Sequence, residues 1–475
     1  MRVDGCKVGS GAAWGLRAAV GAAAMLAVAA GAASADTIKG ALTQAYQNNP
    51  QLNSQRAAVR ATDETVPQAL SGYRPRVSLT ATVNENFQSA IAKSTTGAGL
   101  TQASGNTAVQ NYGGTITQNV LNGFGTASRT QQAEQLVSAA RETLRQTEQN
   151  VLLAAATAYM NLIRDAAIFD LQGRNVEVLQ EQLRQTRDRF TVGEVTRTDV
   201  AQAESRLAAA RASMLVAESN YTTSRSTYRQ VIGVEAGKLA PASPVDRLSP
   251  STLAASIVEA RSRHPAVTTA MFNIDAAMFQ VKIAESSLYP SLSVVGSAAK
   301  GYGSGTSLNT LETFNASVGG QLTIPVYQGG TEYATIRQAK ETLGQRRTDL
   351  DTARDQQQQV AVSWWGQLES AKAQIQATQT QVNASEIALN GVREEARVGQ
   401  RTTLDVLNAQ QELVNARVSL VTAQRDRVVA SYTMLAAVGR LSPQSLELEV
   451  PFYDPKVHYH QVRDTWTGVR TPDGK

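Results

Sequence analysis

The sequence has little of what most soluble enzymes and disulfide-stabilised domains contain. Aromatic residues make up 5% of its 475 residues, and it has one cysteine and three histidines. A single cysteine excludes an intrachain disulfide. The carboxylates show no paired placement that would indicate acid–base catalysis, and no Gly-rich phosphate loop precedes a helix. The sequence therefore predicts no enzyme, no metal site and no cofactor.

An excess of charge of one sign is also missing. The formal net charge is +5, and it falls to +3 without the first 35 residues, which hold three basic residues and one acidic residue. No basic block interleaved with aromatic residues is present, which argues against a nucleic-acid partner.

The first 35 residues have the pattern of a secretion signal. Three basic residues precede an alanine-rich apolar run at 18–31, and a small-x-small site then predicts cleavage between Ala35 and Asp36. The run is too short and too rich in alanine for a membrane anchor. Cleavage removes Cys6, so the mature chain is expected to have no thiol and no lipidated cysteine.

What the chain does have is a long internal repeat. Val192–Val200 (VGEVTRTDV) returns as Val398–Val406 (VGQRTTLDV), at an offset of 206 residues. Four further pairs share this offset: Gly123 and Gly329, Leu207 and Leu413, Arg211 and Arg417, and Gly233 and Gly439. Two proline pairs have an offset of 215: Pro50 and Pro265, and Pro75 and Pro290. Each copy is far longer than a solenoid repeat, so we expect one doubled domain with a change of loop length.

Each copy contains two segments that alternate apolar and polar residues with the period of a β-strand. The strands are expected at about 76–88 and 110–121 in the first copy, and at about 291–300 and 312–325 in the second. A Gly/Ser/Thr/Asn-rich stretch, Ser94–Gly105, predicts the loop of the first hairpin. Strands of about ten residues suffice to cross a bilayer when tilted, although a half-buried strand of a soluble sheet shows the same alternation.

Long helices account for the rest of each copy. Proline is absent from 125–190 and from 330–397, and each stretch predicts one helix, roughly 100 Å long. Returning helices are expected at 197–232 and 403–438, with a 3-4 apolar spacing that favours left-handed coiled coils. The resulting division is a signal peptide at 1–35, a first repeat at 36–233, a linker at 234–252, a second repeat at 253–439 and a C-terminal segment at 440–475.

The expected fold is therefore mainly α-helical, with a small membrane β-sheet and a duplicated helix–β-hairpin–long helix–helix unit. Four strands cannot close a membrane barrel, for which a single chain needs about eight. An open sheet edge in lipid leaves unpaired backbone groups, so membrane strands require an oligomer, and three copies supply twelve strands.

These features, in this order and in both copies, resemble the TolC family of outer-membrane efflux proteins. The resemblance covers almost the whole mature chain and includes a paired motif, Asn49-Pro50-Gln51-Leu52 and His264-Pro265-Ala266-Val267. It also includes Pro75 and Pro290 before the strands, Ile324–Gly330, and the two VGxxT turns. It implies a homotrimer with a twelve-stranded barrel in the outer membrane and a coiled-coil α-barrel in the periplasm.

The implied function is a passive exit duct for multidrug efflux or type I secretion. Its partners would be a periplasmic adaptor (membrane fusion) protein, an inner-membrane efflux pump or ABC exporter, and outer-membrane lipid. The alternative is a soluble periplasmic coiled-coil scaffold or adaptor, although no lipoyl-like or small β-barrel module is visible.

The resemblance also places a periplasmic gate at the two turns. It implies that Arg401 bonds to Thr198 or Asp199, across the two turns of one protomer or with a neighbour's turn, and holds the mouth shut. Ala396 stands where the family has a tyrosine of this latch. Asp405 matches the first carboxylate of a cation-selecting ring, and Asn408 replaces the second. The implied adaptor-docking tips are Val192, Gly193, Thr196, Val398, Gly399 and Thr402.

Local roles explain several of these residues equally well. Gly193 and Gly399 are expected to end helices, Thr196 and Thr402 to cap the next ones, and Asp405 to supply charge near a helix N-terminus. The C-terminal segment is expected to wrap irregularly around the middle of the helices and to end in a disordered tail. Within it, the pair of His458 and His460 is too weak a pattern to predict a metal site.

Overall fold

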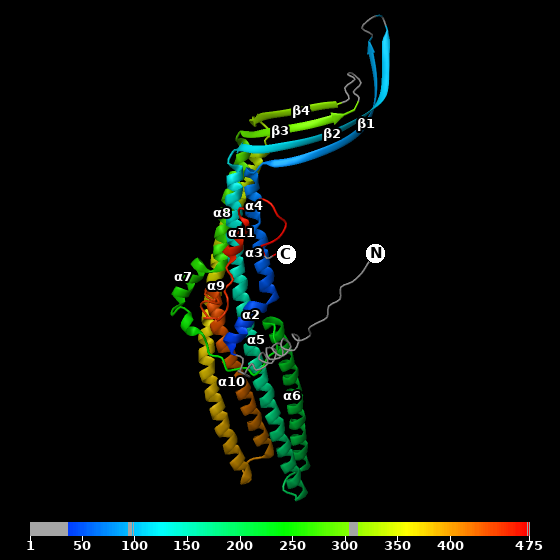
Figure 1. Ribbon diagram of the computed structural model, residues 1–475. Coiled ribbons are helices and arrows are strands. Elements are labelled where there is room, and N and C mark those ends of the chain that lie inside the picture. The colour runs from blue at the N-terminus through cyan, green and yellow to red at the C-terminus, as the bar shows by residue number, and fades with distance from the viewer. Residues whose placement is uncertain (1–36, 94–96, 98, 304–311, 473, 475) are drawn as a thin grey trace, which may run out of the picture.

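The computed structural model describes residues 37–93, 97, 99–303, 312–472 and 474. The expected signal peptide and its cleavage site, Ala35 and Asp36, lie outside this range. The molecule is an elongated stack of helices with a sheet at one end and two helical hairpins at the other (Figure 1).

In both copies, short helices lead to a β-hairpin, a long helix and a returning helix, which confirms the predicted duplication. The first contains α2 (Ile38–Asn48), α3 (Pro50–Asp63), α4 (Thr65–Leu70), η1 (Ser71–Tyr73), β1 (Arg76–Lys93), β2 (Leu100–Asn122), α5 (Gly125–Thr191) and α6 (Arg197–Ile232). The linker contains η2 (Asp246–Leu248). The second copy contains α7 (Leu253–Arg263), α8 (Pro265–Glu285), η3 (Ser286–Leu288), β3 (Ser291–Tyr302), β4 (Glu312–Thr323), α9 (Thr331–Arg397) and α10 (Thr403–Ala437). A last helix, α11 (Pro455–Val462), follows both copies.

The two proline motifs break the chain between helices in equivalent ways. The Asn49 side-chain oxygen accepts hydrogen bonds from the backbone N–H groups of Gln51 and Leu52, at 2.9 and 3.2 Å. In the second copy, His264 Nδ1 accepts the backbone N–H of Ala266 at 3.2 Å. Each proline occupies the first helical position, where its missing N–H costs nothing.

The four strands form one antiparallel sheet in the order β1-β2-β3-β4. The first hairpin is longer than the sequence predicted, because Leu100 to Gly105 pair with Lys93 to Gln88. The loop expected at Ser94–Gly105 is thus partly wrong: polar side chains do not prevent backbone pairing. Since β3 pairs with β2 only as far as the Gln110–Tyr302 pair, the first hairpin projects beyond β3 and β4 (Figure 1).

The long helices run from the sheet to the hairpin tips. α5 and α9 have 67 residues each, and they pack along α6 and α10 respectively. The main core lies midway, where α2, α3, α5, α6 and α10 meet the linker and the C-terminal segment around Leu152, Tyr159 and Leu435. Among the described helices, α5 alone is long and apolar enough to cross a membrane, but half of its apolar window is buried within the chain.

The C-terminal segment is more regular than expected. Asp454 accepts the backbone N–H of Lys456 at 2.9 Å and so caps α11, which corrects the prediction of a wholly irregular wrap. His458 Nδ1 lies 3.1 Å from Asp63 Oδ2 of α3, and the Asp63 side chain is fully buried. Burial raises the pKa of Asp63, while His458 and Arg141 oppose this rise. Across the described chain, no group of three or more His, Cys, Asp or Glu residues is placed to hold a metal ion.

Candidate functional site

The sheet has one apolar face and one hydroxyl-bearing face. The pairing aligns Val77, Ile116, Gly296 and Val318 in one row across the four strands. The adjacent row, whose side chains point to the opposite face, consists of Ser78, Thr115, Ser297 and Ser317. Such a sheet separates an apolar environment from water.

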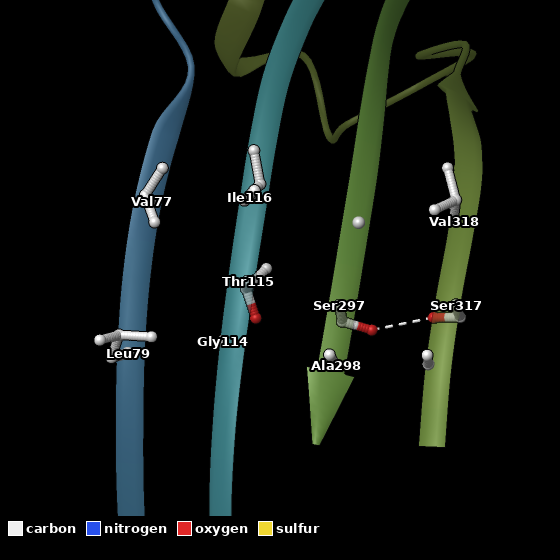
Figure 2. Close-up of a pocket in the computed structure, with 11 residues that line it drawn as sticks. Val77, Leu79, Gly114, Thr115, Ile116, Ser297, Ala298, Ser317 and Val318 are labelled. Atoms are coloured by element: carbon white, nitrogen blue, oxygen red, sulfur yellow. Dashed lines mark hydrogen bonds between the residues drawn. The ribbon is translucent and has the colours of Figure 1, made fainter. Parts of the chain in front are cut away.

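The apolar face is open and shallowly hollowed. Leu79 and Val318 are 85% and 84% exposed, which is unusual for large apolar side chains of a water-soluble protein. They border a hollow of about 500 Å³ with Gly114 and Gly296 among its lining residues (Figure 2). Ser297 and Ser317, which belong to the hydroxyl-bearing row, also line this hollow, and a hydrogen bond of 2.8 Å between them joins β3 to β4.

Aromatic side chains flank both ends of the apolar rows. At the far end, the rings of Tyr112 and Tyr302 meet edge to face with centroids 6.3 Å apart. At the helical end, Phe124 and Tyr327 are 74% and 75% exposed. Phe124 has a left-handed backbone (φ 62°), where the second copy has Gly330. Aromatic girdles at both edges of an apolar band are typical of membrane strands.

The two edges of the sheet are open. Among the described residues of one chain, β1 pairs only with β2, and β4 pairs only with β3. Unpaired backbone groups are costly in lipid, so both edges need a partner strand.

At the opposite end of the molecule, each helical hairpin turns in the same way. Gly193 and Gly399 both have φ of +80°, a conformation that suits glycine. Thr196 caps α6 by accepting the backbone N–H of Asp199 at 3.3 Å, and Asp199 in turn accepts the backbone N–H of Thr196 at 2.9 Å. Such a reciprocal capping box stabilises the start of a helix. The predicted local roles of these turn residues are confirmed.

The second turn repeats this capping box with Thr402 and Asp405, at 3.2 and 3.0 Å. Hydrogen bonds from Thr402 lower the pKa of Asp405, and Arg401 contributes to the same shift. Hydrogen bonds from Thr196 lower the pKa of Asp199 in the same manner. Both carboxylates are therefore ionised at neutral pH and place negative charge at the tips.

Arg401 has a different partner from the one implied by the resemblance. Its Nε donates to Glu395 Oε2 at 2.8 Å, and this contact raises the pKa of Arg401. Among the described residues of one chain, no hydrogen bond joins Arg401 to Thr198 or Asp199, so the contact with a neighbouring protomer's turn stays a prediction. Glu395 lies on the same hairpin, and a local pair requires less ordering of the chain than a pair across two hairpins.

Three residues near the tips were missed by the sequence reasoning. Glu395 is the partner of Arg401, and Arg206 of α6 donates to the Asn408 side-chain oxygen of α10 at 2.7 Å. Leu407 is only 2% exposed and packs among residues of α5 and α6. A comparison of the two copies offers a signal for Leu407, because the matching residue of the first copy is Ala201.

Known proteins are similar to this chain in sequence and in fold. The family model of outer membrane efflux proteins matches residues 41–234 and 256–440, which correspond to the two copies. The outer membrane efflux protein BepC of Brucella suis biovar 1 is 41% identical over 445 residues, which cover 94% of each chain. The outer membrane protein TolC of Escherichia coli K12 is 26% identical, with 85% of this chain and 83% of TolC covered.

A solved structure shows the same architecture. The Campylobacter jejuni CmeC outer membrane channel superimposes with a TM-score of 0.72 over 90% of this chain and 89% of CmeC. Its identity of 16% limits this likeness to the fold. The family match sets aside the alternative of a soluble scaffold or adaptor. The chain belongs to the outer membrane efflux protein family, and it is an outer-membrane exit duct whose helical tunnel extends into the periplasm.

Proposed function

We propose that three copies of the chain close a twelve-stranded barrel, in which β4 of one protomer pairs with β1 of the next. The open edges and the two-faced sheet support this arrangement. The hydroxyl-bearing face then lines the interior, and the apolar face contacts lipid. Detergent-solubilised mature protein is expected to sediment as a trimer. A monomer under conditions that preserve the helical content would contradict the proposal.

The duct is passive in this proposal and has no chemistry of its own. An inner-membrane efflux pump or ABC exporter supplies the cargo, and a periplasmic adaptor docks at the hairpin tips and opens the mouth. The observation that carries the proposal is the position of the two capped turns, at the opposite end of 67-residue helices from the sheet (Figure 1). Val192 and Val398 are 71% and 65% exposed there, and so are available to a partner.

Adaptor docking is testable by site-specific photocrosslinking in cells. A crosslinkable residue at Val192 or Val398 is expected to capture an adaptor with a long helical hairpin. The control position is Val258, which is 68% exposed and belongs to α7, a helix that lies far from the tips (Figure 1). Equal capture at Val258 and at both tips, or none at the tips, would exclude tip docking.

The gate is proposed to act between protomers. Arg401 of one protomer would exchange Glu395 for Thr198 and Asp199 of a neighbouring turn, and Asp405 would contribute to a ring of three carboxylates. An exposed arginine–carboxylate pair contributes only about 0.2–1 kcal/mol, so an adaptor can displace it. Because Ala396 supplies no second latch, loss of Arg401 alone is expected to widen the mouth.

Planar-bilayer recordings test this gate. Arg401→Ser should raise single-channel conductance, whereas the control Arg397→Ser should not, because Arg397 pairs with Glu394 on its own helix at 3.0 Å. Asp405→Ala should weaken block by multivalent cations, because it removes the carboxylate of the proposed ring. Unchanged conductance in Arg401→Ser and unchanged block in Asp405→Ala would show that other groups hold the mouth.

A further inference from the structure

Near the tips, the second hairpin places a buried leucine among apolar residues of the first hairpin. Leu407 belongs to α10, the second hairpin, yet its 2% exposure results from packing into the first hairpin. The cluster that surrounds it comes entirely from the facing seams of α5 and α6: Val176, Leu179, Leu183, Ala203, Leu207 and Ala210.

Among the described residues, the first hairpin makes no equivalent insertion into the second. The residue of the first copy that matches Leu407 is Ala201, which is exposed. The duplicated hairpins are therefore not interchangeable here, because the second inserts a leucine into the first without a reciprocal insertion. Leu413, on the same helix as Leu407, instead packs within its own hairpin, against Val382 and Leu389 of α9.

A polar contact lies directly beside the inserted leucine. Arg206 Nη2 of α6 donates to Asn408 Oδ1 of α10 at 2.7 Å. In the aligned first copy, Gln202 takes the place of Asn408. We call Leu407, Asn408 and Arg206 the hairpin clasp.

On the side of α5 that faces α9, a polar cleft of about 620 Å³ separates the two hairpins. Glu181 on one wall pairs with Arg184 of its own helix at 2.6 Å, and Arg397 on the other wall pairs with Glu394 at 3.0 Å. No ion pair between described residues crosses this cleft. Near the tips, the clasp thus joins the hairpins between α10 and α6, whereas the cleft separates them between α5 and α9.

We propose that the hairpin clasp holds the two hairpins of each protomer together and must open before the periplasmic mouth widens. This inference rests on the proposal that the tips form the gate, but it names a contact within one protomer that does not involve Arg401 or Asp405. Separation of the hairpins would expose Leu407 to water. Since burial of a leucine favours the joined state by about 10- to 100-fold, the clasp biases each protomer toward closure.

Conductance of purified protein in planar bilayers tests the apolar part of the clasp. Leu407→Ala is expected to raise the fraction of time in high-conductance states about tenfold or more, and Asn408→Ala to raise it less. Leu413→Ala is the matched control, because it shortens a leucine that packs within one hairpin. An equal effect of Leu407→Ala and Leu413→Ala, or no effect of either, would overturn the proposal.

Crosslinking tests the contact itself. The only cysteine lies at position 6, before the expected cleavage site, so the mature chain offers a cysteine-free background. The pair Arg206→Cys with Asn408→Cys is treated with a short, reducible thiol-specific crosslinker. The control pair, Arg393→Cys with Gln410→Cys, joins positions that are hydrogen-bonded at 2.9 Å within the second hairpin.

Both pairs are expected to crosslink, but only the first should hold the channel in its low-conductance state until the crosslinker is reduced. Failure of the first pair to crosslink while the control does, or a crosslinked first pair with unrestricted opening, would refute the clasp. If the clasp behaves as expected while Arg401→Ser and Asp405→Ala have no effect, only the proposed gate residues are wrong.

Discussion

Replacement of His264 by Asn should make the stability of this protein less dependent on pH in the mildly acidic range. The substitution copies the other repeat, where Asn49 caps α3 just as His264 caps α8. His264 Nδ1 can accept the Ala266 N–H only while it is unprotonated, and the side chain lies in a site that is 6% exposed. Asn keeps an acceptor at the cap and does not titrate.

The expected size of the pH-dependent change in stability follows from the pKa of His264. Burial, and the nearby positive charge of Arg145, lower the pKa of His264 from its ordinary 6.5 to about 4, while a hydrogen bond to the backbone of Ala436 opposes the shift. Below pH 6.5 the unfolded chain binds a proton at this position that the folded chain excludes. The stability that unprotonated His264 contributes to the folded chain is therefore fully present above pH 6.5 and is lost as the pH falls through about 4. It amounts to something on the order of 3 kcal/mol.

Thermal unfolding in detergent, followed by far-UV circular dichroism across this pH range, provides the measurement. The melting temperature of the wild type should fall more steeply with decreasing pH than that of His264→Asn, and the two should agree most closely above pH 6.5. His264→Ala should be less stable at every pH because it loses the cap. His460→Asn is the control, since His460 is exposed. Parallel pH profiles for wild type and His264→Asn would refute the reasoning.

Three further outcomes are expected. Leu79→Arg, on the apolar face, should cost about 2–4 kcal/mol near the bilayer midplane and reduce the protein recovered in outer-membrane fractions. Ser78→Arg, on the opposite face, should be tolerated, and equal recovery of both variants would contradict the assignment of faces. Thr402→Ala should destabilise the start of α10 by about 1 kcal/mol, measured as faster hydrogen exchange confined to the second tip. Exchange that is faster throughout the chain would count against a local role. His458→Ala leaves its buried carboxylate partner without a hydrogen bond and should lower stability by about 1–3 kcal/mol in thermal unfolding, whereas His460→Ala should not.

The sequence by itself determined the long helices, the presence of two strands in each copy, and the duplication. Period-two alternation, proline-free stretches and paired VGxxT turns each depend on residues that are close along the chain, and the structure confirms them. The proline motifs and the caps at Thr196 and Thr402 were predictable for the same reason, because a cap involves residues within one helical turn. The requirement for a closed sheet also followed from the sequence, since four strands leave two open edges.

Only the tertiary structure decided which partner each side chain has. Arg401 pairs with Glu395, Leu407 is buried in the opposite hairpin, and His458 contacts Asp63 across 395 positions of sequence. These contacts depend on the rotation and spacing of helices that meet through long-range packing. A seam with 3-4 spacing specifies that a helix has a partner, but an apolar residue outside the seam, such as Leu407, becomes buried only where another hairpin leaves room for it.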